Sequence, residues 1–171
     1  VIPNAVGNEL VAIATTPAER RRAITAMGRL TAQKDYPTLI KAFGRFYKRH
    51  PDFKLEIYGS GNDKDFLCRL TQDMGLDDCV IFEGAVKDAI LKVASSSCYV
   101  MSSTYEGMPN ALMEALAVGT PCVSTDCPFG PAELICNGKN GILVPVGDDK
   151  ALADAMCKMI ENTEFAENCA K

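Results

Sequence analysis

The sequence comprises 171 residues, of which 47% are hydrophobic and 23% are charged, and its net charge is −4. This length is enough for one domain with a substantial core and is short for two. The acidic balance argues against a dedicated nucleic-acid-binding protein, which would carry a basic face, and no apolar run approaches the roughly 18 residues of a membrane span.

Apolar segments of two kinds alternate along the chain. Residues 1–22 lack a regular pattern and are predicted to be a connector entering a domain; we interpret the arginine run at residues 20–22 as solvated surface. Short runs with strand character are predicted at residues 23–27, 53–58, 79–82, 98–101, 121–124 and 141–144. Helical spacing of apolar residues predicts helices at residues 36–47, 66–74, 89–95, 109–118, 131–136 and 148–161.

Strands that alternate with helices indicate βαβ units and a parallel sheet covered on both faces. We therefore predict one α/β domain over residues 23–171, a Rossmann-like, doubly wound parallel sheet of about six strands. Ligands of such sheets bind at the carboxyl ends of the strands. The loops at residues 28–34, 59–61, 84–86, 102–109 and 126–131 each follow a predicted strand, so they should gather at one edge of the sheet.

The eight cysteines form no Cys-x-x-Cys pair, and several lie inside apolar runs. We interpret them as reduced, buried side chains of a cytosolic protein. A zinc site would need ligands at suitable spacing, and His50 is the only histidine. Since His50 precedes Pro51 at a predicted helix end, a favourable interaction with the helix dipole is the expected role of this side chain.

Glu106 and Glu114 are the only charged residues between Lys92 and Asp126, inside a long apolar stretch. A buried carboxylate without a partner costs several kcal/mol, so hydroxyls or cations are expected beside each of them. Residues 107–110, Gly-Met-Pro-Asn, read as a tight turn that opens a helix, and free backbone N–H groups at a helix start attract phosphate. Together these features favour a ligand that contains both sugar and phosphate.

Two cations, Arg29 and Lys34, lie in the loop after the first predicted strand. The planar fork of an arginine and the point charge of a lysine suit a diphosphate, although two solvated surface charges would look the same in isolation. Gly59 and Gly61 resemble the beginning of a dinucleotide fingerprint, but Lys64 stands where its third glycine belongs. The pair therefore predicts a tight turn near a ligand and is weak evidence for a nicotinamide cofactor.

The chain resembles the C-terminal half of a GT-B-fold retaining glycosyltransferase of family 4. The resemblance rests on six segments that span nearly the whole chain: residues 1–4, Val-Ile-Pro-Asn; Gly28-Arg29-Leu30 with Lys34; Gly84; residues 106–115, Glu-Gly-Met-Pro-Asn-Ala-Leu-Met-Glu-Ala; residues 126–133, Asp-Cys-Pro-Phe-Gly-Pro-Ala-Glu; and residues 140–145, Asn-Gly-Ile-Leu-Val-Pro. The two glutamates with Arg29 and Lys34 are its most specific part.

The resemblance implies that the domain binds a nucleotide sugar. Arg29 and Lys34 would hold the diphosphate, Glu114 the ribose hydroxyls and Glu106 the donor sugar, while backbone near Val86 would meet the base. The catalytic candidates are Glu106, Arg29 and Lys34. The full set of donor-binding candidates is Gly28, Arg29, Lys34, Gly59, Val86, Glu106, Gly107, Met108, Pro109, Asn110 and Glu114. The resemblance also implies an enzyme that needs no metal, so no metal ligand is expected. No cofactor is expected either, and the nucleoside diphosphate sugar counts as a substrate.

By the same resemblance, the full protein is expected to transfer a hexosyl unit, UDP-linked, to a polysaccharide or glycolipid. A glycan or glycolipid acceptor would bind an N-terminal domain that this sequence lacks, so this chain alone should be inactive. The expected location is cytoplasmic, compatible with peripheral association at the cytoplasmic face of a membrane, and no nucleic-acid partner is expected. The alternatives are a noncatalytic sugar-nucleotide-binding module and another GT-B enzyme, such as a sugar-nucleotide epimerase; a nicotinamide dehydrogenase ranks below both.

Overall fold

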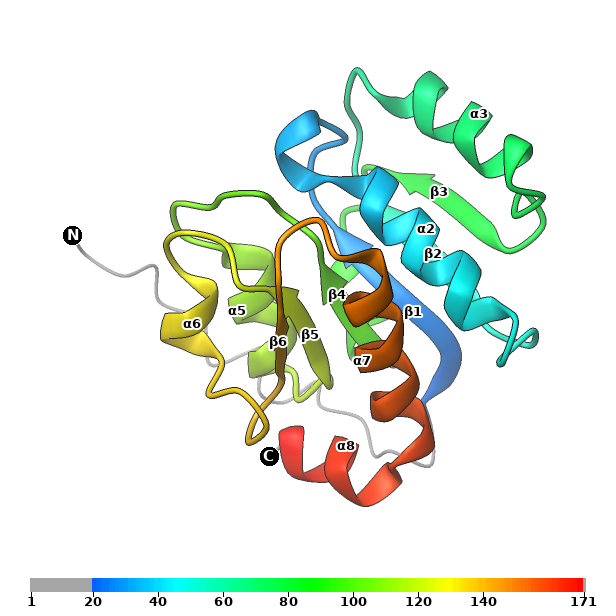
Figure 1. Ribbon diagram of the computed structural model, residues 1–171. Coiled ribbons are helices and arrows are strands. Elements are labelled where there is room, and N and C mark those ends of the chain that lie inside the picture. The colour runs from blue at the N-terminus through cyan, green and yellow to red at the C-terminus, as the bar shows by residue number, and fades with distance from the viewer. Residues whose placement is uncertain (1–19, 171) are drawn as a thin grey trace.

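The computed structural model describes residues 20–170, which contain a six-stranded sheet in the order β3-β2-β1-β4-β5-β6 (Figure 1). All neighbouring strands pair in parallel. Their bounds are Arg21–Met27 (β1), Lys54–Tyr58 (β2), Val80–Gly84 (β3), Ser96–Met101 (β4), Cys122–Thr125 (β5) and Ile142–Val144 (β6). This is the doubly wound Rossmann order, with its reversal point between β1 and β4, and the predicted fold class is confirmed.

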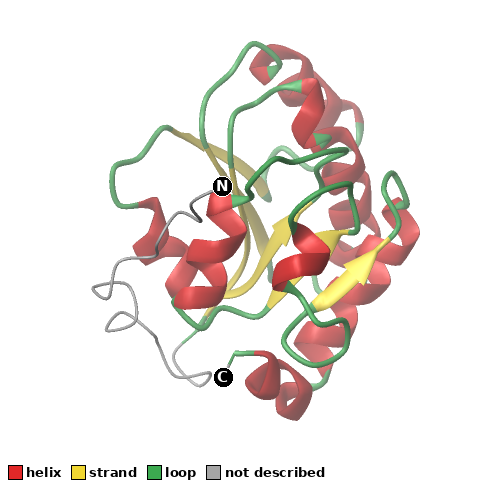
Figure 2. Cartoon of the chain, turned by 90° about the vertical axis from the view of Figure 1, so that its left-hand side faces the viewer, coloured by secondary structure: helices red, strands yellow, loops and turns green. Residues whose placement is uncertain are grey.

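Helices cover both faces of the sheet (Figure 2). They are the short 3-10 helix η2 (Ala32–Lys34) and the α-helices α2 (Tyr36–Tyr47), α3 (Lys64–Asp73), α4 (Ala89–Ala94), α5 (Asn110–Ala117), α6 (Pro131–Leu134), α7 (Asp149–Glu161) and α8 (Thr163–Cys169). Each predicted strand and helix is present, with ends that differ by a few residues, as expected for element boundaries. The helix α8 was not predicted.

Strand β4 shows how the chain builds two cores. Successive side chains of a strand point to opposite faces. Cys98 and Val100 accordingly join the larger cluster, which α2, α7 and α8 cover, whereas Tyr99 and Met101 join the smaller cluster beneath α4, α5 and α6. Because both faces are buried, β4 reads as a continuous apolar run, which is typical of a central parallel strand.

The arginine run corrects one expectation. Arg21 forms a two-pronged ion pair with the buried Glu56, with N–O distances of 2.6 and 3.0 Å. Arg20 donates to the backbone carbonyl oxygens of Ala94 and Ser96. The interpretation of residues 20–22 as solvated surface is therefore wrong for two of the three arginines, and β1 begins at Arg21 rather than at residue 23. The rest of the predicted connector, residues 1–19, lies outside the described residues.

Six of the eight cysteines are buried, as predicted; Cys68 is half-buried and Cys136 is exposed. No helix in the described range combines the length and the apolar character needed to cross a bilayer.

Candidate functional site

The loops at the carboxyl ends of the strands lie together, as the topology predicts. The backbone N–H of Gly28, after β1, donates to the carbonyl oxygen of Tyr58 at 2.9 Å, and that of Gly59, after β2, donates to the carbonyl oxygen of Gly84 at 2.7 Å. A Cβ on Gly59, whose φ is +140°, would lie 1.9 Å from the carbonyl oxygen of Gly28. Gly59 thus allows two loops to approach more closely than any side chain would permit.

A buried ion pair occupies the middle of this edge. The Nζ of Lys34 lies 2.5 Å from Oε1 of Glu106, and the hydroxyl of Ser103 donates to the same oxygen at 2.6 Å. The side chains of Lys34 and Glu106 are only 18% and 6% exposed. Glu106 therefore has both a cation and a hydroxyl beside it, as expected for a carboxylate in an apolar stretch. The cation is Lys34, which was predicted to bind the diphosphate.

Lys34 is held in place by backbone contacts on both sides. It ends η2, and its carbonyl oxygen accepts from the hydroxyl of Ser102 at 2.7 Å, while the N–H of Thr104 donates to the carbonyl oxygen of Gln33 at 2.9 Å. Asp35 follows in the left-handed conformation, and its side chain accepts from the N–H of Thr38 to cap α2. The loop after β1 is thus fixed to the end of β4.

The charge of Glu106 extends to its neighbours. Burial first, and then this carboxylate, raise the pKa of the Tyr36 hydroxyl. The same two causes raise the pKa of the Cys127 thiol. Both groups therefore stay neutral at physiological pH. The opposite charges of Lys34 and Glu106 compensate each other within their ion pair.

Glu114 lies in a different environment. It occupies the second turn of α5 and is half-buried, and burial raises the pKa of its carboxyl group. Within residues 20–170 its carboxylate has neither an ion pair nor a hydrogen-bond partner, so the alternative of a structural salt bridge is not realised. The helix start that precedes it has Pro109 as its N-cap, which provides no side-chain cap. At this end of α5 the N–H of Asn110 donates to the carbonyl oxygen of Met108, and the N–H groups of Leu112 and Met113 donate to that of Pro109.

An open pocket of about 520 Å³ adjoins the ion pair. Its lining comes from the ends of β1 and β2 and from the loop after β3, and consists of Met27, Gly28, Arg29, Tyr58, Gly59, Ser60, Ala85, Val86, Lys87 and Ala89. A Cβ on Gly28 would lie 3.0 Å from Cε of Lys34, so the pocket and the ion pair are immediate neighbours.

The predicted site residues therefore fall into three groups along one edge. Gly28, Arg29, Gly59 and Val86 share the pocket, and Lys34 pairs with Glu106 beside it. Residues 107–110 and Glu114 lie on the loop and helix after β4 and do not line the pocket. A separate cavity of about 310 Å³ at the opposite edge, beneath α8, contains none of these residues.

Sequence reasoning missed the residues that hold the ion pair. Ser103 bonds the carboxylate of Glu106, and Ser102 fixes the backbone of Lys34. The signal was present as three consecutive hydroxyl residues, Ser102, Ser103 and Thr104, directly after the buried strand β4. Polar residues at the carboxyl end of a parallel strand are site candidates on topology alone.

The comparisons with known proteins agree with this geometry. Residues 12–171 match the family model of the glycosyl transferases group 1. The chain belongs to this family. Among its curated relatives is an uncharacterized glycosyltransferase of Methanocaldococcus jannaschii. The two are 35% identical, and the match covers 81% of this chain and 41% of the relative. The lipopolysaccharide core biosynthesis glycosyltransferase LpsE of Rhizobium meliloti is 33% identical over 91% of this chain and 44% of the relative.

Solved structures share the fold. The pneumococcal O-GlcNAc transferase GtfA, solved in complex with UDP and GlcNAc, superimposes with a TM-score of 0.83 and is 26% identical, covering 92% of this chain and 32% of that one. The C-terminal domain of the group 1 glycosyl transferase LpcC from Francisella tularensis gives a TM-score of 0.78 at 25% identity, covering 87% of this chain and 80% of that one. The group 1 domain described here thus spans about two fifths of its curated relatives and corresponds to the C-terminal domain of a GT-B glycosyltransferase.

Proposed function

We propose that the chain is the donor-binding domain of a retaining glycosyltransferase, which transfers a hexosyl unit from a UDP-linked sugar to a polysaccharide or glycolipid acceptor. The observation that carries the proposal is the buried pair of Lys34 and Glu106 beside a pocket that contains Arg29. The UDP and GlcNAc named for the GtfA complex support the donor class. The acceptor would bind a further domain outside this chain, at the cytoplasmic face of a membrane, and this chain alone would transfer nothing.

In this proposal Arg29 and Lys34 bind the diphosphate of the donor. Arg29 is exposed at the pocket, and its side chain makes no hydrogen bond or ion pair to another residue of the described range. During transfer the bond between the anomeric carbon and the diphosphate breaks, and its electron pair remains on the diphosphate. The acceptor hydroxyl oxygen bonds to the anomeric carbon, and its proton passes to the departing diphosphate. The two cations stabilise the negative charge that develops on the leaving group.

Lys34 must exchange partners when the donor binds. Without the donor its ammonium is held by Glu106, and a diphosphate would compete for it with more negative charge. The carboxylate of Glu106, still held by Ser103, would then be free to accept hydroxyl groups of the donor sugar. One ion pair would thus be replaced by two contacts with the donor.

Glu114 is proposed to bind the ribose. A carboxylate accepts two hydrogen bonds, which suits the vicinal 2′- and 3′-hydroxyls. Burial without a partner disfavours its charged form, as its raised pKa records. A ribose diol would supply the missing donors, while the uracil would meet the backbone near Val86 at the far side of the pocket.

The proposal is tested by titrating the chain with UDP, GDP, ADP and NAD by calorimetry, without added metal. UDP should bind, and Arg29→Ala should weaken UDP by about 10- to 100-fold, because hydrogen bonds to charged groups contribute roughly 1.5–3 kcal/mol. The same variant should leave uridine, which has no phosphate, nearly unchanged. Equal affinity of the variant and the parent for UDP would contradict the assignment of Arg29.

The alternatives give different results in the same experiment. Binding of NAD in place of UDP would favour a dehydrogenase. Conversion of a UDP-sugar to its epimer, followed by NMR on the full-length protein, would favour an epimerase. Binding of a UDP-sugar by the full-length protein without transfer to any acceptor would favour the noncatalytic module.

A further inference from the structure

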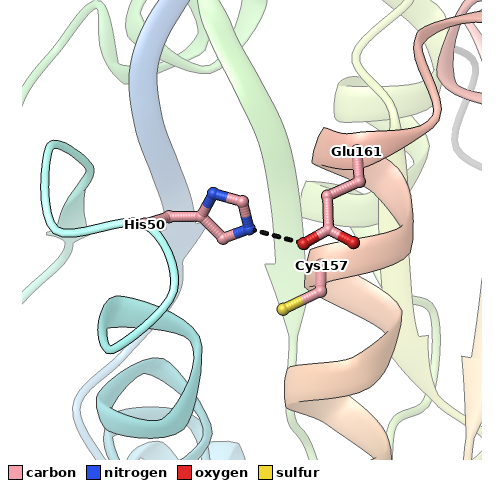
Figure 3. Close-up of side chains that lie close together, drawn as sticks. All are labelled: His50, Cys157 and Glu161. Carbon is pink, nitrogen blue, oxygen red and sulfur yellow. Dashed lines mark hydrogen bonds and ion pairs between the residues drawn. The ribbon is translucent and has the colours of Figure 1, made fainter.

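Three side chains with metal-binding atoms meet at the edge of the sheet opposite the donor site. His50 follows the end of α2, and Cys157 and Glu161 lie on the last two turns of α7 (Figure 3). Their ligand atoms all lie within 4.8 Å of one another, and Nε2 of His50 is 3.0 Å from Oε1 of Glu161. The proposed transferase chemistry uses none of them.

The fold fixes this arrangement from two sides. Cys157 and Glu161 are four residues apart on one helix and therefore share a face of α7, and α2 and α7 lie side by side on the same face of the sheet (Figure 1). The imidazole of His50 stacks on Phe46 at 4.7 Å and meets the edge of Phe53 at 5.9 Å between ring centroids. Its side chain is only 17% exposed, so the ring is positioned before any ligand arrives.

The cluster already attracts a positive charge. The guanidinium of Arg49 lies 2.6 and 2.8 Å from the two oxygens of Glu161. Arg49 is 55% exposed and can swing into solvent, so another cation could take its place. The alternative is that His50, Arg49 and Glu161 form an ion cluster that only stabilises the fold, in which the Cys157 thiol binds no metal.

We propose that His50, Cys157 and Glu161 bind one divalent cation of the zinc class, with Arg49 displaced. Imidazole nitrogen, thiolate sulfur and carboxylate oxygen are the donors that zinc takes, at about 2.0–2.3 Å. Tetrahedral ligands at such distances are about 3.4 Å apart. The farthest pair of ligand atoms must therefore close by at most roughly 1.4 Å, a shift that small side-chain rotations can supply. The fourth position is left to water, and the bound ion would join α2 to α7.

Cobalt and zinc titrations of the reduced, metal-free chain test the proposal. One equivalent of Co²⁺ should bind, with a thiolate-to-metal charge-transfer band, and Zn²⁺ should displace it. His50 is the only histidine in the sequence, so imidazole ligation seen by X-ray absorption or by histidine NMR can come from this site alone. At a hundredfold excess over its dissociation constant, Zn²⁺ should raise Tm by about 5–10 °C.

Variants separate this site from the other seven cysteines. His50→Gln and Glu161→Gln, at partly exposed positions, should each weaken binding by about 100-fold or more, since loss of even an outer partner of a metal site costs 10- to 100-fold. Cys136→Ser, at the exposed cysteine, is the matched control and should change nothing. Arg49→Gln should bind the ion more tightly, because a competing charge is gone. Absence of stoichiometric binding, or binding that survives His50→Gln unchanged, would overturn the proposal.

Discussion

The ion pair between Lys34 and Glu106 allows one stability effect to be worked out from its surroundings. Lys34→Met removes the ammonium and leaves the Glu106 carboxylate, 6% exposed, with the Ser103 hydroxyl as its remaining donor. Breaking a buried ion pair from one side costs about 3–5 kcal/mol, and the remaining hydrogen bond places the expected loss near 3 kcal/mol. Glu106→Gln keeps an oxygen that both donors can reach, and Lys34 is 18% exposed, so that loss should be about 1–2 kcal/mol.

Urea unfolding followed by circular dichroism measures both variants and their double variant. The double variant should lose less than the sum of the two, by about 1–2 kcal/mol, because it contains no unpaired charge. A loss below about 1 kcal/mol for Lys34→Met, or strict additivity, would refute this account of the pair.

Three further predictions concern other positions. Burial raises the pKa of Glu114, so the folded state holds more protons than the unfolded state, and stability falls as the pH rises through the pKa values of the two states. Glu114→Gln should remove this pH dependence and gain up to about 1 kcal/mol of stability at pH 7 in urea unfolding. The same variant should bind UDP more weakly in calorimetry. Gly59→Ala places a Cβ 1.9 Å from a carbonyl oxygen and should cost more than about 3 kcal/mol, whereas Gly84→Ala, also at positive φ but in open space, should cost about 1–2 kcal/mol in the same assay. Burial acts to raise the pKa of Glu56, but hydrogen bonds from Arg21 and a tyrosine hydroxyl hold it below its usual value. This carboxylate therefore stabilises the fold at pH values above its unfolded pKa, and the stabilisation is lost in acid. Arg21→Gln should cost about 3 kcal/mol of stability at pH 7 and reduce the further loss on acidification.

The sequence was sufficient for the architecture because each element leaves a local trace. Buried strands appear as short apolar runs and helices as a repeat of 3.6 residues, and their alternation leaves few topologies. Helix α8 escaped prediction because it follows α7 after the single residue Asn162, whose side chain caps it by accepting from the N–H of Phe165. Such a cap changes the direction of the chain without a glycine or proline to mark the break.

The edge that carries the site could also be predicted, whereas the partners within it could not. Topology brings the loops together, but Lys34 and Glu106 are 72 residues apart, and which cation meets which carboxylate depends on the close approach of η2 to the end of β4. The cluster of His50, Cys157 and Glu161 was even harder to predict, because His50 lies after α2 and the other two lie on α7, so spacing in the sequence does not reveal the group.

The pairing of Lys34 with Glu106 also makes a prediction about affinity. A nucleoside diphosphate that binds Lys34 must break its ion pair with Glu106. The free energy of binding is therefore that of the contact between Lys34 and the diphosphate, reduced by the free energy needed to break the ion pair. Glu106→Gln weakens the competitor and should therefore bind UDP more tightly than the parent, by a few-fold. The gain should shrink for a UDP-sugar, because the amide is a poorer acceptor for sugar hydroxyls than the carboxylate, and transfer by the full-length protein should fall. Calorimetry with UDP and with the UDP-sugar separates the two effects. Weaker binding of UDP itself by Glu106→Gln would show that the carboxylate positions Lys34 for phosphate and does not compete with it.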